Sequence, residues 1–96
     1  MNDYNTAGPI SLWAEGERPR EKLLEKGRGA LSDAEILAIL LGSGSRNESA
    51  VELARRLLRM AGNNLLALGR LDVRELMKVK GIGPAKAGGI AAAMEL

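Results

Sequence analysis

The sequence VKGIGPAKA at Val79–Ala87 decides the fold of this chain. Its two glycines flank a single isoleucine, and glycine permits a tight chain reversal because it adopts positive φ without steric cost. Pro84 follows at once and suits the first position of a helix, where its missing N–H is not needed. We therefore predict a hairpin at Val79–Ala87 that joins two short helices.

Both helices beside this hairpin have sequence signals of their own. Asp72 and Glu75 have the spacing of a capping box, which predicts the start of a short helix before the hairpin. After the hairpin, apolar residues recur at the i, i+3, i+4 and i+7 spacing of a buried helix face, namely Ala87, Ile90, Ala91 and Met94. The pattern therefore predicts a last helix that packs on the core.

Two further capping boxes lie upstream. Ser32 with Glu35 predicts the start of an apolar helix at Asp33–Leu41. Ser49 with Glu52 predicts the start of a helix that has a broad apolar stripe. A short helical turn is expected next, at Asn63–Gly69.

The first 17 residues show no helical periodicity and contain glycine and proline, so we predict an irregular tail at 1–17 and a helical domain at 18–96. The first helix is expected to begin near Arg18, with Pro19 in an early position, and to end at Gly27.

Length and composition agree with one small all-α domain of five or six short helices. The chain has 96 residues, of which 46% are hydrophobic and only 2% aromatic. Leu, Ala, Ile, Val and Met suit packed helices, and no segment alternates at period two. A second folded unit has no room at this length.

The chain contains no Cys and no His. This excludes disulfides, Cys/His zinc sites and the nucleophile pairs that depend on imidazole. We therefore predict no enzymatic activity, no metal and no cofactor for this chain; a magnesium-dependent nuclease that uses carboxylates alone is the weakest hypothesis. The longest apolar run, Ile36–Leu41, is too short to span a membrane, and no secretion signal is present, so we expect a cytoplasmic protein.

Charge is unevenly distributed along the chain. Residues 1–48 have six basic and eight acidic side chains, whereas residues 49–96 have eight basic and four acidic ones. No acidic residue lies between Leu76 and Met94, and three lysines surround the predicted hairpin. Loop amides, the free N–H groups at the next helix N-terminus and these lysines together predict a phosphate site. The candidate DNA-binding residues are Lys78, Lys80, Gly81, Ile82, Gly83, Ala85 and Lys86.

A weak internal repeat suggests another hairpin, upstream of the one at Val79–Ala87. If Asp33 is placed on Asp72, Gly42 falls on Gly81 and Gly44 on Gly83. The corresponding candidate residues are Gly42, Ser43, Gly44, Ser45 and Arg46, although no lysine precedes this loop and a plain turn is the favoured interpretation. The arginines Arg55, Arg56 and Arg59 are interpreted as a solvated helix face, with Glu52 available to pair with Arg55 or Arg56.

Several strings of residues resemble a known family. The hairpin resembles the helix-hairpin-helix element of DNA repair and recombination proteins, and residues 12–96 resemble the N-terminal domain of bacterial RadC-like proteins. The supporting strings are RPREKLL at residues 18–24, LSDAEILAILL at residues 31–41 with the glycines that follow, and KGIGPAKA at residues 80–87.

This resemblance implies a tandem helix-hairpin-helix domain that is normally followed by a domain similar to JAB/MPN zinc metallopeptidases. That second domain is absent from this chain, so we expect the chain to be a fragment. In the full-length protein its own C-terminal domain would be a partner. The family name implies a role in DNA repair.

Two functions remain open on these grounds. The first is a module that binds the backbone of duplex or branched DNA independently of sequence, because amides and lysines contact phosphates without reading base edges. The second is a helical module for protein interaction or structure, in which Gly81-Ile82-Gly83 is only a tight turn. Neither function involves a membrane.

Overall fold

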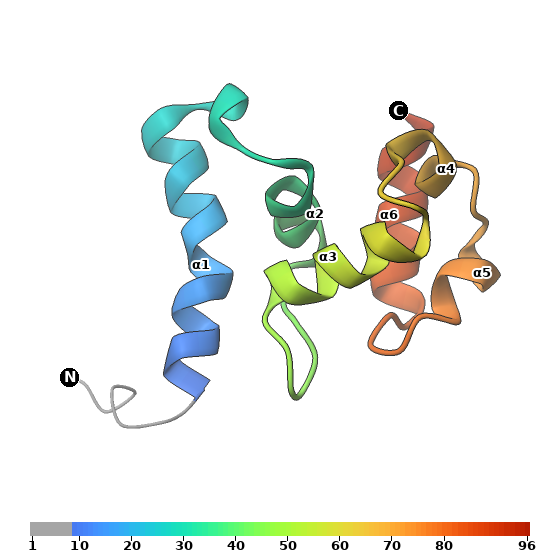
Figure 1. Ribbon diagram of the computed structural model, residues 1–96, viewed down its shortest axis with the longest axis horizontal. Coiled ribbons are helices and arrows are strands. Elements are labelled where there is room, and N and C mark those ends of the chain that lie inside the picture. The colour runs from blue at the N-terminus through green and yellow to red at the C-terminus, as the bar shows by residue number, and fades with distance from the viewer. Residues whose placement is uncertain (1–8) are drawn as a thin grey trace.

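The computed structural model describes the backbone of residues 9–96 and the side chains of residues 18–96 (Figure 1). The elements in chain order are α1 (Pro9–Lys26), the 3-10 helix η2 (Arg28–Ala30), α2 (Asp33–Leu41), α3 (Ala50–Met60), α4 (Leu65–Gly69), α5 (Val73–Met77) and α6 (Pro84–Glu95). Within residues 9–96 there is no β-strand, only an isolated bridge between Ser45 and Glu48. The predicted all-α class is confirmed.

The three predicted capping boxes are all present, at the starts of α2, α3 and α5. In each box the N-cap side chain accepts a hydrogen bond from the third helical N–H, and the third helical carboxylate accepts one from the N-cap N–H. The residue pairs are Ser32 with Glu35, Ser49 with Glu52, and Asp72 with Glu75. Local sequence therefore determines where these helices begin.

The expected start of the first helix is wrong. Helix α1 begins at Pro9 rather than near Arg18, so 9–17 is helical and not an irregular tail. Residues 1–8 of the predicted tail lie outside the described residues. Pro19 consequently stands inside the helix, where it removes one backbone hydrogen bond. Its ring is almost fully buried, and this burial offsets part of that cost.

The core is aliphatic and lies where α2, α3, α5 and α6 meet. Its least exposed large residues include Leu37, Leu53, Leu57, Leu76 and Ile90. Burying each such side chain contributes about 1.5 to 3 kcal/mol. Helix α1 stands beside α2 at one side of the molecule, and α3 crosses the middle between α2 and α6 (Figure 1). No helix in residues 9–96 is both long and apolar enough to cross a membrane.

Two helix-loop-helix units follow one another, as the repeat predicts, but they are unequal. We call the loop Gly42–Ser49 between α2 and α3 the first hairpin, and the segment Lys78–Gly83 between α5 and α6 the second hairpin. Both lie on the lower side of the molecule in the view of Figure 1. Helix α2 has nine residues and α5 only five. The repeat does align two glycines of positive φ, Gly42 and Gly81, but α6 begins directly after Gly83 whereas α3 begins only at Ala50.

Candidate nucleic-acid interface

The second hairpin is a tight turn, as the sequence predicts. The Ile82 N–H donates a 3.0 Å hydrogen bond to the Val79 carbonyl, and Gly81 has φ of 95°. A positive φ at the third turn position alone is typical of a type II turn. Ile82 is 4% exposed and Val79 is 9% exposed, so both side chains anchor the turn to the core.

The two glycines of this hairpin have different reasons to be glycine. A Cβ atom at Gly81 would lie 3.3 Å from Leu53 Cδ1 and 3.4 Å from Arg56 Nη2, at a backbone angle that disfavours side chains. Gly83 has an ordinary φ of −94°, and a Cβ there would meet nothing within 4 Å. The fold therefore requires a glycine at position 81 but not at position 83.

The N-terminus of α6 beside Gly83 is open. No side chain caps it, and Pro84 supplies no N–H. Within the described residues 18–96, the backbone N–H groups of Gly83, Ala85 and Lys86 have no acceptor. Free amides at a helix N-terminus attract anions through their partial positive charge.

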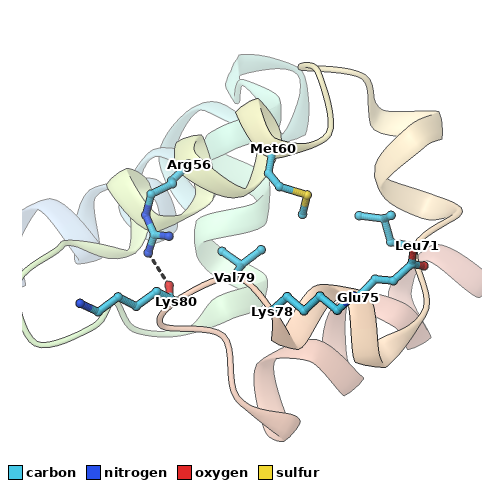
Figure 2. A pocket seen from close by; sticks show the side chains of 7 residues that line it. All are labelled: Arg56, Met60, Leu71, Glu75, Lys78, Val79 and Lys80. Atoms are coloured by element: carbon cyan, nitrogen blue, oxygen red, sulfur yellow. Dashed lines mark hydrogen bonds between the residues drawn. The ribbon is translucent and has the colours of Figure 1, made fainter.

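The three lysines occupy different places around this opening. Lys78 and Lys80 are exposed on either side of the inward-facing Val79, and Lys86 stands in the first turn of α6. Ala85 is also exposed. A hollow of about 510 Å³ between α3 and the second hairpin includes Lys78, away from the α6 N-terminus (Figure 2). Its lining residues are Arg56, Met60, Leu71, Glu75, Lys78, Val79 and Lys80.

The first hairpin, by contrast, has a bridged turn and a capped helix start. The Ser45 N–H donates a 3.1 Å hydrogen bond to the Glu48 carbonyl, and the Glu52 N–H donates a 3.1 Å bond to Ser49 Oγ. A Cβ at Gly44 would lie 1.9 Å from the Glu48 carbonyl oxygen, so chain packing alone requires this glycine. Gly42 ends α2 with φ of 80°, and its carbonyl accepts a hydrogen bond from Arg20.

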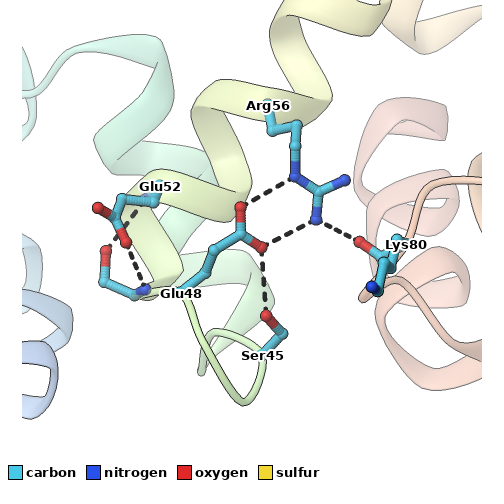
Figure 3. A network of polar contacts seen from close by, with 6 residues as sticks. Ser45, Glu48, Glu52, Arg56 and Lys80 are labelled. Atoms are coloured by element: carbon cyan, nitrogen blue, oxygen red, sulfur yellow. Dashed lines mark hydrogen bonds and ion pairs between the residues drawn. The ribbon is translucent and has the colours of Figure 1, made fainter. Parts of the chain in front are cut away.

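A network around Arg56 joins the two hairpins (Figures 2 and 3). Its guanidinium donates hydrogen bonds of 2.9 and 2.8 Å to the two Glu48 carboxylate oxygens and another to the Lys80 carbonyl. Ser45 Oγ donates a 3.2 Å bond to Glu48 Oε1. The Arg56 hydrogen bonds hold the pKa of Glu48 below its ordinary value, and Glu48 raises the pKa of Arg56.

No local pattern in the sequence indicated this network. Arg56 was interpreted as part of a solvated face, but it pairs with Glu48 and not with Glu52, whose carboxylate completes the capping box. Arg55 and Arg59 are exposed, as expected. Arg56 and Lys80 are 24 positions apart, so no local spacing indicates their contact.

The candidate residues of both hairpins lie side by side. Lys86 Nζ donates a 3.2 Å hydrogen bond to Ser43 Oγ, across 43 positions of sequence. Nearby, Lys80 and Gly81 of the second hairpin face the tip of the first across a hollow of about 480 Å³. The residues that line it are Ser45, Arg46, Asn47, Glu48, Lys80 and Gly81. The two predicted loops thus form one continuous surface.

The chain has clear relatives among known proteins. The family model described as UPF0758 N-terminal matches residues 10–88. A UPF0758 protein of Flavobacterium johnsoniae is 60% identical over 87 residues, which are 91% of this chain and 38% of the relative. A UPF0758 protein of Coprothermobacter proteolyticus is 47% identical over 96 residues, which are 100% of this chain and 40% of the relative.

The chain therefore spans about two fifths of the length of these curated relatives. No solved structure matches it. Because the family model covers most of the residues, including the whole second hairpin, the chain belongs to the UPF0758 N-terminal family.

Proposed function

We propose that this domain binds the phosphate backbone of DNA through the second hairpin, without reading the base sequence. One observation supports this proposal above the others. The α6 N-terminus has an uncapped glycine at Gly83 and a lysine, Lys86, at the third helical position. Both features disfavour the helix by itself, and both favour a bound anion.

The size of these two effects can be stated. Glycine at the N-cap position in place of serine costs a helix roughly 0.3 to 0.5 kcal/mol. A lysine in the first turn opposes the helix dipole, and the cost of this is about 0.3 to 1 kcal/mol. A phosphate at this position would accept hydrogen bonds from the backbone N–H groups of Ala85 and Lys86. It would also form an ion pair with the Lys86 ammonium. It would therefore reverse both penalties.

The donors also indicate which part of DNA is bound. Backbone amides and lysines contact phosphate oxygens, which are the same at every base pair. The only aromatic residues of the chain are Tyr4 and Trp13, far in sequence from the hairpin, so stacking on single-stranded bases has little support. Duplex or branched DNA is the favoured ligand.

The length of the relatives indicates that such a module is part of a larger protein. They are about two and a half times as long as the matched segment, since it covers 38 to 40% of them. Together with the resemblance to the N-terminal domain of RadC-like proteins, this supports a role in which the module brings the rest of the protein to DNA.

The test is a charge reversal at the hairpin with a matched control. Lys80→Glu combined with Lys86→Glu should weaken binding of a short duplex and lower the salt slope of log K by about 2, since each lost phosphate contact lowers it by about 0.9. Lys26→Glu combined with Arg28→Glu makes the same charge change at two exposed positions around the end of α1. This control should retain most of the affinity.

Equal salt slopes for both double variants would rule out the second hairpin as the site. If the chain binds no duplex at low salt, but retains a protein partner after Gly81 is replaced, the interaction-module alternative is correct.

A further inference from the structure

The hollow between the hairpins has an unusual balance of charge. Of the residues that line it, Arg46, Asn47 and Lys80 are exposed, and their side chains have no hydrogen-bond or ion-pair partner within residues 18–96. Arg46 and Asn47 are the two central residues of the turn closed by the Ser45–Glu48 bridge. Two cations and an amide donor therefore face one hollow from two different hairpins.

The only carboxylate that lines the hollow is already neutralised. Glu48 accepts hydrogen bonds from Arg56 at both oxygens and from Ser45 Oγ at one of them. Its charge and its lone pairs are thus directed to Arg56 rather than into the hollow. An anion entering from solvent would meet the free side chains of Arg46, Asn47 and Lys80.

The two walls of the hollow are also held in place. Arg56 fixes the Lys80 carbonyl to the first hairpin, and Lys86 reaches Ser43 on the same loop. The close approach of Gly81 to Ser45, with a virtual Cβ 3.4 Å from Ser45 Cβ, leaves little room for the hairpins to slide. A site built on such a pair is formed before the ligand arrives, which lowers the entropic cost of binding.

We propose that this hollow binds a second phosphate of the same DNA backbone, next to the one at the α6 N-terminus. Arg46 and Lys80 supply the charge, and the Asn47 amide supplies a further donor. This inference rests on the proposed function and adds the first hairpin to it. The preferred ligand is then a chain of successive phosphodiesters rather than a single phosphate group.

An isosteric substitution tests the second subsite. Asn47→Asp adds a negative charge to the hollow without changing the shape of the side chain, and should lower duplex affinity about tenfold at low salt, equivalent to about 1.4 kcal/mol. Asn63→Asp is the matched control, because Asn63 is exposed beyond the end of α3 and its φ of 57° is tolerated by aspartate. Its affinity should stay within about twofold of wild type.

A second pair of variants measures the contact between Arg46 and a phosphate. Arg46→Ala should lower the salt slope by about 0.9, as expected for one lost phosphate contact, whereas Arg28→Ala, in η2, should leave it unchanged. The duplex affinity of each variant is measured by fluorescence anisotropy of a labelled duplex over a series of salt concentrations.

The outcomes separate the subsite from the proposed function. If Asn47→Asp and Arg46→Ala behave like their controls while the Lys80→Glu/Lys86→Glu variant still loses binding, the second subsite is refuted and the first remains. If neither set changes binding, or if the chain binds no duplex, both proposals are refuted.

Discussion

The helix after the first hairpin begins with a capping box, whereas the helix after the second hairpin has none. At the N-cap position the first has Ser49 with a capping hydroxyl, and the second has Gly83 with no side chain. At the third helical position the first has Glu52 and the second has Lys86. The backbone of the two N-cap residues is similar and extended, at φ −72° and ψ 167° against φ −94° and ψ −172°.

The difference therefore lies in side-chain chemistry and not in backbone shape. Both loops lead into a helix N-terminus (Figure 1). The first has a capping hydroxyl and a carboxylate at that position, so the N–H groups of Ser49 and Glu52 are bonded. The other lacks such side chains and adds lysines. Of the two loops, only the second lacks the local pattern that stabilises a helix start, and such departures are expected where function overrides stability.

The largest expected effect is on the fold of the second hairpin. Gly81→Ala places a side chain at φ of 95° and within 3.3 Å of Leu53 Cδ1, so it should destabilise the protein by about 2 kcal/mol. Thermal or denaturant unfolding measures this. Gly89→Ala, within α6 and with nothing near its virtual Cβ, should instead stabilise by about 0.5 to 1 kcal/mol. Two equal effects would refute the steric argument.

The next effect is on the link between the hairpins. Arg56→Met keeps much of the side-chain length but removes the hydrogen bonds to Glu48 and to the Lys80 carbonyl. We expect a loss of about 1 kcal/mol, because the pair is partly exposed and screened by solvent. Arg55→Met, at an exposed position of the same helix, should change stability by less than about 0.5 kcal/mol. If the Arg56→Met and Arg55→Met variants are equally stable, the network contributes nothing to the stability of the fold.

The smallest effect is a pH dependence of the first hairpin. Arg56 holds the pKa of Glu48 below its ordinary value of 4.5, so this carboxylate stabilises the fold above about pH 4.5. The contribution is lost as the pH falls through the lowered folded-state pKa. Glu48→Gln should therefore lose less stability than wild type between about pH 6 and about pH 3. An identical loss in both proteins would contradict this assignment.

The sequence predicts those parts of the structure that depend on local signals, namely the helix starts and the glycine turn. Capping boxes such as Ser32 with Glu35 act over three residues, and the glycine turn at Gly81 acts over four, so they can be identified from spacing alone. The α6 N-terminus, with Gly83 and Lys86, was also identified in this way.

Contacts between distant residues could not be found by the same means. Arg56 reaches Lys80, and Lys86 reaches Ser43, only because α2, α3 and α6 pack around one core. The start of α1 at Pro9 was missed because glycine and proline in 1–17 favoured an irregular segment, whereas the structure has a helix with Pro19 inside it. Neither Gly16 nor Pro19 ends this helix, so these residues are poor indicators of its bounds.

If the open N-terminus of α6 exists for a phosphate, Gly83→Ser should change stability and DNA binding in opposite directions. The position has N-cap geometry and open space, so a serine hydroxyl there can accept the Lys86 N–H as Ser49 accepts that of Glu52. Stability and duplex affinity are measured on the same variant. We expect stability to rise, by about 0.5 kcal/mol, while duplex affinity falls. Higher stability with unchanged duplex affinity would contradict it.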